Sequence, residues 1–207
     1  MRRINAGVFM SLDGVMQAPG GPGEDDDGGF TMGGWLPPIG DEGIFETVGA
    51  LFTPPYALLL GRKTYDIFAG HWPFVEGEEA AFGQALTAAD KYVVTSRTDP
   101  LPWANSHRLA SIDAVAALKH TDGPDLLIQG SSTLYPALLA AGLIDRLTIM
   151  TFPVVLGHGK RLFGTGTPPL AMRMVEHRVT PRGTVVATYE PEGPAQTGHF
   201  LGHEPKE

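Results

Sequence analysis

The chain has 207 residues, of which 43% are hydrophobic, and this is enough to bury one sizeable core in a single domain. A formal net charge of -8 makes it a poor candidate for non-specific nucleic-acid binding, which needs clustered Lys and Arg, so no nucleic-acid partner is expected. The sequence contains no cysteine, which excludes disulfides, thiolate metal sites and cysteine nucleophiles and fits a cytoplasmic protein.

The N-terminal third begins with an expected strand over Ile4–Leu12. Its apolar run is short and is interrupted by Asp13, so neither a signal peptide nor a membrane span is expected. A long Gly/Pro/Asp-rich loop follows over Gln17–Gly40, and loops of this length in compact domains are usually functional or mobile. The acidic run Glu24–Asp27 lacks the spaced ligands of a calcium loop and is interpreted as a solvated tip.

The rest of the chain is expected to alternate strands with helices. Expected helices cover Asp41–Leu51, a segment beginning near Arg62, Glu76–Ala89, Ser111–Lys119 and Ser131–Ala141, and expected strands cover Tyr56–Leu60, Lys91–Thr95, His107–Ala110, Asp125–Gln129 and Leu143–Phe152. A closing hairpin is expected from Leu170–Thr180 and Thr184–Pro191. This order predicts an α/β fold: a mostly parallel sheet with an antiparallel C-terminal edge and helices on both faces. The domain is expected to span residues 1–190, followed by a flexible tail over 191–207.

Three of the expected strands end in sequences suited to binding phosphate. They are Leu60–Thr64, Val94–Arg97 and Ile128–Ser132. Free backbone N–H groups at a helix start, with Arg, Lys and hydroxyl side chains beside them, are suited to phosphate oxygens. Taken alone, each of these three sequences also fits an ordinary turn, a solvated loop or a helix cap, and none is a GxGxxG or P-loop motif. Their position at successive strand ends favours one extended phosphorylated ligand.

The chain resembles the dihydrofolate reductase-like superfamily. More closely, it resembles the reductase domain of the bacterial bifunctional deaminase-reductase of riboflavin biosynthesis and the stand-alone relatives of that domain. The segments that carry the resemblance are SLDGVMQ (Ser11–Gln17), LLLGRKTYDIF (Leu58–Phe68), TSR (Thr95–Arg97) and QGSSTLYPALLAAGLIDRLTIMTFPVVLGHGKRLF (Gln129–Phe163). The resemblance implies a dihydrofolate reductase-like fold and NADPH, rather than NADH, as the cofactor.

The resemblance also implies which residues contact NADPH. Gly61, Arg62 and Thr64 match the family's first phosphate-binding turn, Ser96 and Arg97 match the turn near the adenosine 2′-phosphate, and Gly130, Ser131 and Ser132 match the turn that supports the pyrophosphate. A guanidinium and a hydroxyl suit a dianionic phosphate. Many dihydrofolate reductases have a Gly-Gly pair where this chain has Gly130-Ser131. The Ser131 Cβ therefore leaves slightly less room for the pyrophosphate, while the Ser131 hydroxyl adds a hydrogen-bond donor.

Two carboxylates are candidates for the catalytic role. In dihydrofolate reductases a carboxylate on the first helix after the long loop holds the pterin, and the resemblance implies that Asp41 does so here, with Glu42 as an alternative. Acidic residues at a helix start are also expected from the helix dipole alone. Asp13 is the second candidate, because the resemblance implies that its loop covers the nicotinamide; a plain Asp-Gly turn is the alternative. Val15 stands where riboflavin reductases typically have a substrate-binding Lys, which weakens the case for their substrate.

The sequence thus predicts an NADPH-dependent reductase that transfers hydride to a small heterocyclic or ring-opened substrate. It would be of the 5-amino-6-(5-phosphoribosylamino)uracil reductase or dihydrofolate reductase type. The alternative is a non-catalytic nucleotide-binding or regulatory protein on the same fold. No metal site is expected. The resemblance implies a homodimer, with Leu143–Val155 as the predicted interface; an ordinary core strand is the other interpretation of that segment.

Overall fold

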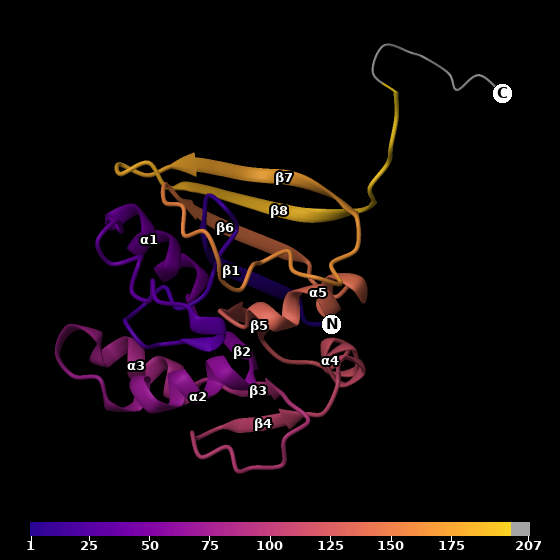
Figure 1. Cartoon of the computed structure of the whole chain (residues 1–207). Coiled ribbons are helices and arrows are strands. Elements are labelled where there is room, and N and C mark those ends of the chain that lie inside the picture. Colours follow the sequence, from indigo (N-terminus) through magenta and orange to yellow (C-terminus); the bar gives the residue numbers. More distant parts are fainter. Residues whose placement is uncertain (200–207) are drawn as a thin grey trace.

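The computed structural model describes residues 1–199, in which eight strands form one sheet in the order β4-β3-β2-β5-β1-β6-β8-β7 (Figure 1). The strands are β1 (Ile4–Ser11), β2 (Tyr56–Gly61), β3 (Lys91–Val94), β4 (Ser106–Leu109), β5 (Asp125–Gln129), β6 (Arg146–Phe152), β7 (Leu170–Val179) and β8 (Val185–Pro194). All pairs from β4 to β6 are parallel, whereas β8 is antiparallel to both β6 and β7. The predicted fold class is therefore confirmed.

Helices cover both faces of this sheet (Figure 1). The helices α1 (Glu42–Leu51), α2 (Arg62–His71) and α3 (Ala80–Ala88) lie on one face, and α4 (Ile112–Lys119) and α5 (Tyr135–Ala140) lie on the other. The apolar run of β2 serves both layers, because successive side chains of a strand point to opposite faces. Ala57 and Leu59 pack with the α4–α5 cluster, and Leu58 and Leu60 pack with the α2–α3 cluster. A continuous apolar strand is thus buried on two sides.

Two helices begin later than the sequence predicts. The segment expected to be helical from Ser131 starts with a 3-10 turn over Ser132–Leu134, because Ser131 has a left-handed backbone with φ 58. The helix expected from Glu76 is likewise a 3-10 turn over Gly77–Glu79 followed by α3. At the C-terminus, β8 continues to Pro194, past the predicted start of the tail at residue 191. Residues 200–207 of that tail lie outside the described residues.

The segment predicted to form the dimer interface includes a strand from the interior of the sheet. The segment Leu143–Val155 contains β6, which lies inside the sheet between β1 and β8, and Leu147, Met150 and Phe152 are 0% exposed. These three side chains belong to the core of one chain, whereas Val155 at the end of the segment is 67% exposed. The homodimer itself stays a prediction.

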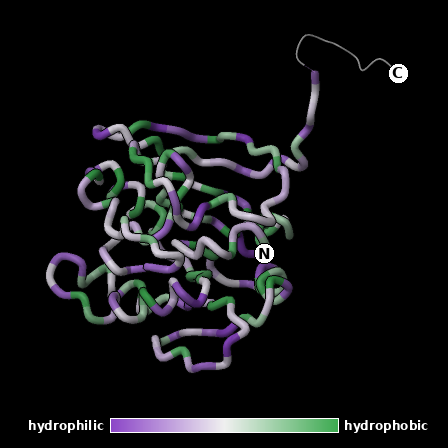
Figure 2. The backbone as a smooth tube through the Cα atoms, in the orientation of Figure 1, coloured by the Kyte–Doolittle hydropathy of each residue, from purple (hydrophilic) through white to green (hydrophobic). Residues whose placement is uncertain are grey.

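Strand β7, at one edge of the sheet, is largely exposed. Along β7 hydrophilic and hydrophobic residues alternate in short groups (Figure 2), and Met174 and Val179 are exposed. In the described part of the chain, no helix is long and apolar enough to cross a membrane.

Candidate functional site

Two of the three predicted phosphate-binding turns are joined directly by hydrogen bonds. The Ser131 Oγ accepts a hydrogen bond from the Gly61 N–H at 2.9 Å, and the Thr64 Oγ1 accepts one from the Ser131 N–H at 2.9 Å. Gly130 has φ 63, and a Cβ there would lie 3.0 Å from the Thr64 Cγ2, so the turn needs glycine both for its conformation and for space. The end of β2, the start of α2 and the end of β5 therefore form one unit, here called the laced turn.

A cavity of about 510 Å³ borders the laced turn, within the roughly 300–1,000 Å³ typical of small-molecule sites. Five of the eight predicted cofactor residues line it: Gly61, Thr64, Gly130, Ser131 and Ser132. Its opposite wall is α1, which contributes Ile44, Phe45, Val48 and Gly49. The cavity thus combines a polar wall suited to phosphate with an apolar wall suited to a flat ring.

The other three predicted cofactor residues lie beyond the cavity lining. Arg62 pairs with Asp66 at 2.7 Å, Arg97 pairs with Asp99 at 2.7 Å, and the crossed pairs Arg62–Asp99 and Arg97–Asp66 are both 3.8 Å apart. Hydrogen bonding from Arg97 holds the pKa of Asp99 below its usual range. The two arginines therefore lie close together, in a cluster whose charges cancel. Ser96 is exposed next to Arg97.

Asp41, the first predicted catalytic residue, caps α1. Its Oδ1 accepts a hydrogen bond from the Ile44 N–H at 3.2 Å, and its Oδ2 accepts one from the Arg182 N–H at 2.8 Å. Burial works to raise its pKa, but hydrogen bonds from Thr180, Arg182 and Ile44 outweigh burial and lower it. Asp41 and Glu42 are not among the residues that line the cavity. This carboxylate connects α1 to the β7–β8 turn, and its predicted catalytic role has no support in the geometry.

Asp13, the second predicted catalytic residue, is held in a similar way. It accepts hydrogen bonds from the Ser11 hydroxyl at 2.7 Å and from the N–H groups of Leu156 and Gly157 at 3.0 and 2.8 Å. These bonds, that from Ser11 first, lower the pKa of Asp13 to about 2. Asp13 is therefore ionised at neutral pH, fastens the loop after β1 to the loop after β6, and is a poor proton donor.

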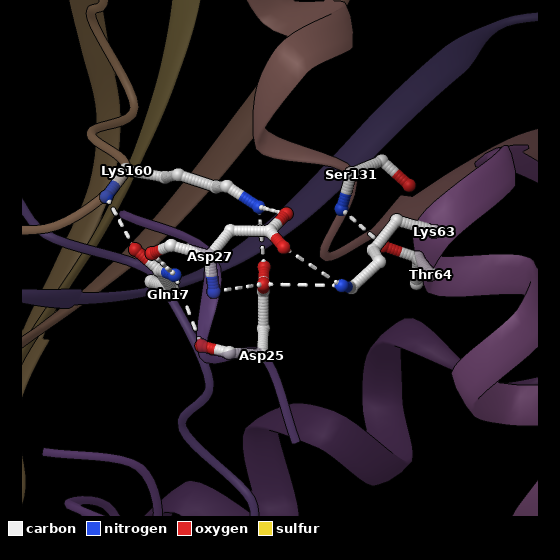
Figure 3. A network of polar contacts seen from close by, with 7 residues as sticks. All are labelled: Gln17, Asp25, Asp27, Lys63, Thr64, Ser131 and Lys160. Carbon is white, nitrogen blue, oxygen red and sulfur yellow. Dashed lines mark hydrogen bonds and ion pairs between the residues drawn. The ribbon is translucent and has the colours of Figure 1, made fainter. Parts of the chain in front are cut away.

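The acidic run of the long loop is not the solvated tip that the sequence predicts. Asp25 is 8% exposed, and its Oδ2 lies 2.6 Å from the Lys160 Nζ. Asp27 also lies 2.6 Å from Lys160, and the Lys63 Nζ lies 3.4 Å from Asp25 and 3.2 Å from Asp27 (Figure 3). We call these four residues the acidic clasp. No local sequence pattern predicts these ion pairs, because Lys63 is 36 residues from Asp27 and Lys160 is 135 residues from Asp25.

The Gln17 side chain makes hydrogen bonds to the backbone of three residues of the acidic clasp. Its amide nitrogen donates to the backbone carbonyls of Asp25 and Asp27, each at 3.0 Å, and its amide oxygen accepts from the Lys160 N–H at 2.9 Å. The Gln17 carbonyl in turn accepts a hydrogen bond from the Trp35 indole at 2.8 Å. The long loop is therefore fastened to the strand-end region by an uncharged side chain as well as by ion pairs.

Two further polar side chains face the cavity that sequence reasoning did not select. Glu24 lines it, and burial raises the pKa of this carboxyl against the opposing effect of hydrogen bonds from the Gly20 and Gly21 N–H groups. Gln129, at the end of β5, also lines it, and its buried amide oxygen has no hydrogen-bond partner within residues 1–199. A raised carboxyl pKa and an unsatisfied buried acceptor are both typical of binding and catalytic sites.

The sheet order and the cavity at the strand ends define a dihydrofolate reductase-like fold. Residues 2–186 match the family described as the RibD C-terminal domain, and the chain belongs to that family. A curated relative is "Uncharacterized protein YyaP" of Bacillus subtilis, which is 26% identical over 198 residues, covering 93% of this chain and 96% of the relative.

Solved structures agree on the fold. A "Putative riboflavin biosynthesis protein" from Shewanella superposes with a TM-score of 0.65 at 23% identity, covering 93% of this chain and 99% of that one. A pyrimidine reductase-like protein from Corynebacterium diphtheriae gives a TM-score of 0.59 at 14% identity, covering 92% of each chain. Dihydrofolate reductase from Enterococcus faecalis, solved in complex with NADP(H), gives 0.56 at 14% identity, covering 92% and 96%.

The laced turn makes a stability prediction at Ser131. Ser131→Ala leaves the buried Gly61 N–H without a partner, so the free energy of unfolding is expected to fall by about 1–3 kcal/mol. Ser131→Gly loses the same hydrogen bond but removes a left-handed strain of about 1 kcal/mol, so it is expected to lose less. Urea unfolding of the three proteins measures both differences. An alanine variant as stable as the wild type would show that the bond contributes nothing.

A second prediction concerns Asp13 and pH. Since its folded pKa of about 2 lies below the unfolded value of 3.8, its contribution to stability is complete above the unfolded value and disappears as the pH falls towards 2. Asp13→Asn is expected to lower the free energy of unfolding by about 1–3 kcal/mol at neutral pH, and by progressively less below pH 4. Chemical unfolding across pH tests this, with exposed Asp122→Asn as the control. A deficit that is independent of pH would argue against the assignment.

Proposed function

We propose that this protein is an NADPH-dependent reductase that transfers hydride to a C=N or C=O group of a small heterocyclic or ring-opened substrate. The observation that carries the proposal is the laced turn on the rim of the cavity, in a chain of the RibD C-terminal domain family. The laced turn fixes the start of α2, whose first-turn N–H groups have no partner within the helix and suit a pyrophosphate, together with the Thr64 and Ser132 hydroxyls.

The residues present fit such a cofactor. Thr64 and Ser132 would hold the pyrophosphate, with Ser131 positioning this turn through its bonds to Gly61 and Thr64 and Gly130 leaving room for the Thr64 side chain. Arg97, with Ser96, would hold the 2′-phosphate at the end of β3. The cofactor would supply the hydride, while the protein orients the two reactants and excludes water.

The substrate is proposed to lie against the apolar wall of α1. Ile44, Phe45 and Val48 offer a surface for a flat ring, and Gln129 lines the same cavity at the end of β5. Val15 is 0% exposed, and a Cβ on Gly159 would lie 2.6 Å from its Cγ1, so the position of the typical lysine gives no substrate contact here. This favours a substrate other than the phosphoribosyl aminopyrimidine.

The proposed proton donor is Glu24 instead of Asp13 or Asp41. It borders the cavity, and the charged or titratable groups that act on it are Asp25, which raises its pKa, and His71, which lowers it. A carboxyl with a raised pKa keeps its proton to higher pH and can deliver it during hydride transfer.

A second candidate function is a non-catalytic nucleotide-binding protein. The specific observation in its favour is the α1 wall, where the four cavity-lining residues carry no ionisable group. It predicts tight NADPH binding without hydride transfer to any offered substrate, including dihydrofolate and the aminopyrimidine ribosyl phosphate.

Cofactor choice is tested at Arg97. Arg97→Ala is expected to weaken NADPH binding about tenfold, because a charged hydrogen bond to the 2′-phosphate is lost, and to leave NADH binding nearly unchanged. Titration of the full chain with each dinucleotide measures the two dissociation constants. Arg173→Ala, on the distant β7, is the matched control. Equal losses for NADPH and NADH would refute the 2′-phosphate role, and no NADPH binding by the wild type would refute the proposed function.

The proton donor is tested at Glu24. In the wild type, the rate of NADPH oxidation is expected to fall as the pH rises through the raised pKa of Glu24. Glu24→Gln is expected to be about a hundredfold slower and to lose that pH dependence. Steady-state rates with dihydrofolate or the aminopyrimidine ribosyl phosphate across pH measure this, with exposed Glu76→Gln as the control. A glutamine variant with the wild-type pH profile would exclude Glu24.

A further inference from the structure

We propose that Asp25 and Asp27 are an internal competitor for the cofactor phosphate, holding the ammonium group of Lys63 until a ligand phosphate replaces them. The inference rests on the proposed function, since it requires a phosphorylated ligand beside Thr64. It makes Lys63 a phosphate-binding residue that Asp25 and Asp27 release when the ligand binds.

The position of Lys63 is the first support. It lies in the first turn of α2, next to Thr64, whose hydroxyl is part of the laced turn, and both residues line the cavity. Asp25 and Lys160 line the same cavity from the other side. In Figure 3 the two carboxylates lie between the two lysine ammonium groups, with Thr64 and Ser131 close to Lys63. The carboxylates therefore hold the Lys63 ammonium group away from a phosphate that would bind at the start of α2.

The acidic clasp is strong on one side and weak on the other. On the strong side, the side chains of Lys160 and Asp25 are only 28% and 10% exposed, and their charged atoms lie 2.6 Å apart. On the weak side, the Lys63 side chain is 51% exposed and its distances to the carboxylates are 3.2 and 3.4 Å. Exposed ion pairs of this kind contribute little to stability, so the clasp would open at Lys63 and remain closed at Lys160.

The local backbone allows this opening without unfolding the loop. Gln17 holds the backbone carbonyls of Asp25 and Asp27, and Trp35 holds the Gln17 carbonyl, by hydrogen bonds that do not involve Lys63. Immediately after Asp27, Gly28 and Gly29 have φ 68 and 74, a region that glycine enters freely. A phosphate also gains the backbone N–H groups at the start of α2, which the side chains of Asp25 and Asp27 do not contact in the clasp. The exchange therefore favours the ligand.

The test is dinucleotide affinity in charge variants of the full chain. Asp27→Asn removes one competitor and is expected to tighten NADPH and NADH binding equally, by about two- to fivefold, because Lys63 faces the pyrophosphate that both share. Asp26→Asn, an exposed neighbour without an ion pair to Lys63 in residues 1–199, is the control and is expected to bind like the wild type. Lys63→Ala is expected to weaken both dinucleotides, and in that background Asp27→Asn is expected to give no gain.

The outcomes separate this inference from the proposed function. NADPH binding by the wild type with no gain in Asp27→Asn, or a gain that persists in the Lys63→Ala background, overturns the internal competitor alone. No NADPH binding by any of the proteins overturns the proposed function and the competitor together. Hydrogen exchange at residues 25–29 without dinucleotide gives a readout independent of activity: it is expected to be faster in Asp27→Asn than in Asp26→Asn, and equal exchange overturns the clasp itself.

Discussion

The cavity depends on the hydrogen bonds that join the ends of β2 and β5. Ser131 has a left-handed backbone that costs free energy for a residue with a Cβ, and in that conformation its hydroxyl satisfies the buried Gly61 N–H while its own N–H meets Thr64. This fixes the start of α2 against the 3-10 turn over Ser132–Leu134. The rim therefore presents its donors in one orientation, which is what binding an extended anion requires.

Charge pairing is the second organising feature of the site. The cations near the strand ends are already paired: Arg62 and Arg97 with Asp66 and Asp99, and Lys63 and Lys160 with Asp25 and Asp27. In an acidic chain with a formal net charge of -8, the proposed phosphate site would in this way need no large positive surface. Affinity for a phosphate then depends on which carboxylates it must displace, and not only on how many cations surround it.

The sequence predicts the fold well because local patterns carry it. The apolar run at Ala57–Leu60 and the Gly-Arg after it locate β2 and the start of α2, and Gly130 marks the matching turn after β5. Helix starts are less predictable where one residue takes two roles. Ser131 looks like a helix cap, yet it serves the strand-end turn and delays α5.

The substrate half of the site is less predictable for a physical reason. Asp13 and Asp41 have the right residue type at the right place in the chain, but besides local bonds to Ser11 and Ile44 they bind the backbone of Leu156, Gly157 and Arg182, all more than a hundred positions away. The acidic clasp likewise joins segments that no sequence window contains. Burial and pKa follow from such long-range contacts, so Glu24 and Asp25 gain their character only in the folded chain.

The most direct measurement is a crystal structure of the full chain with NADP⁺ bound. The account predicts the pyrophosphate against Thr64 and Ser132, the 2′-phosphate at Arg97, and the nicotinamide towards the apolar wall of α1. A dinucleotide bound away from the laced turn, or crystals that take up none at saturating concentration, would contradict it.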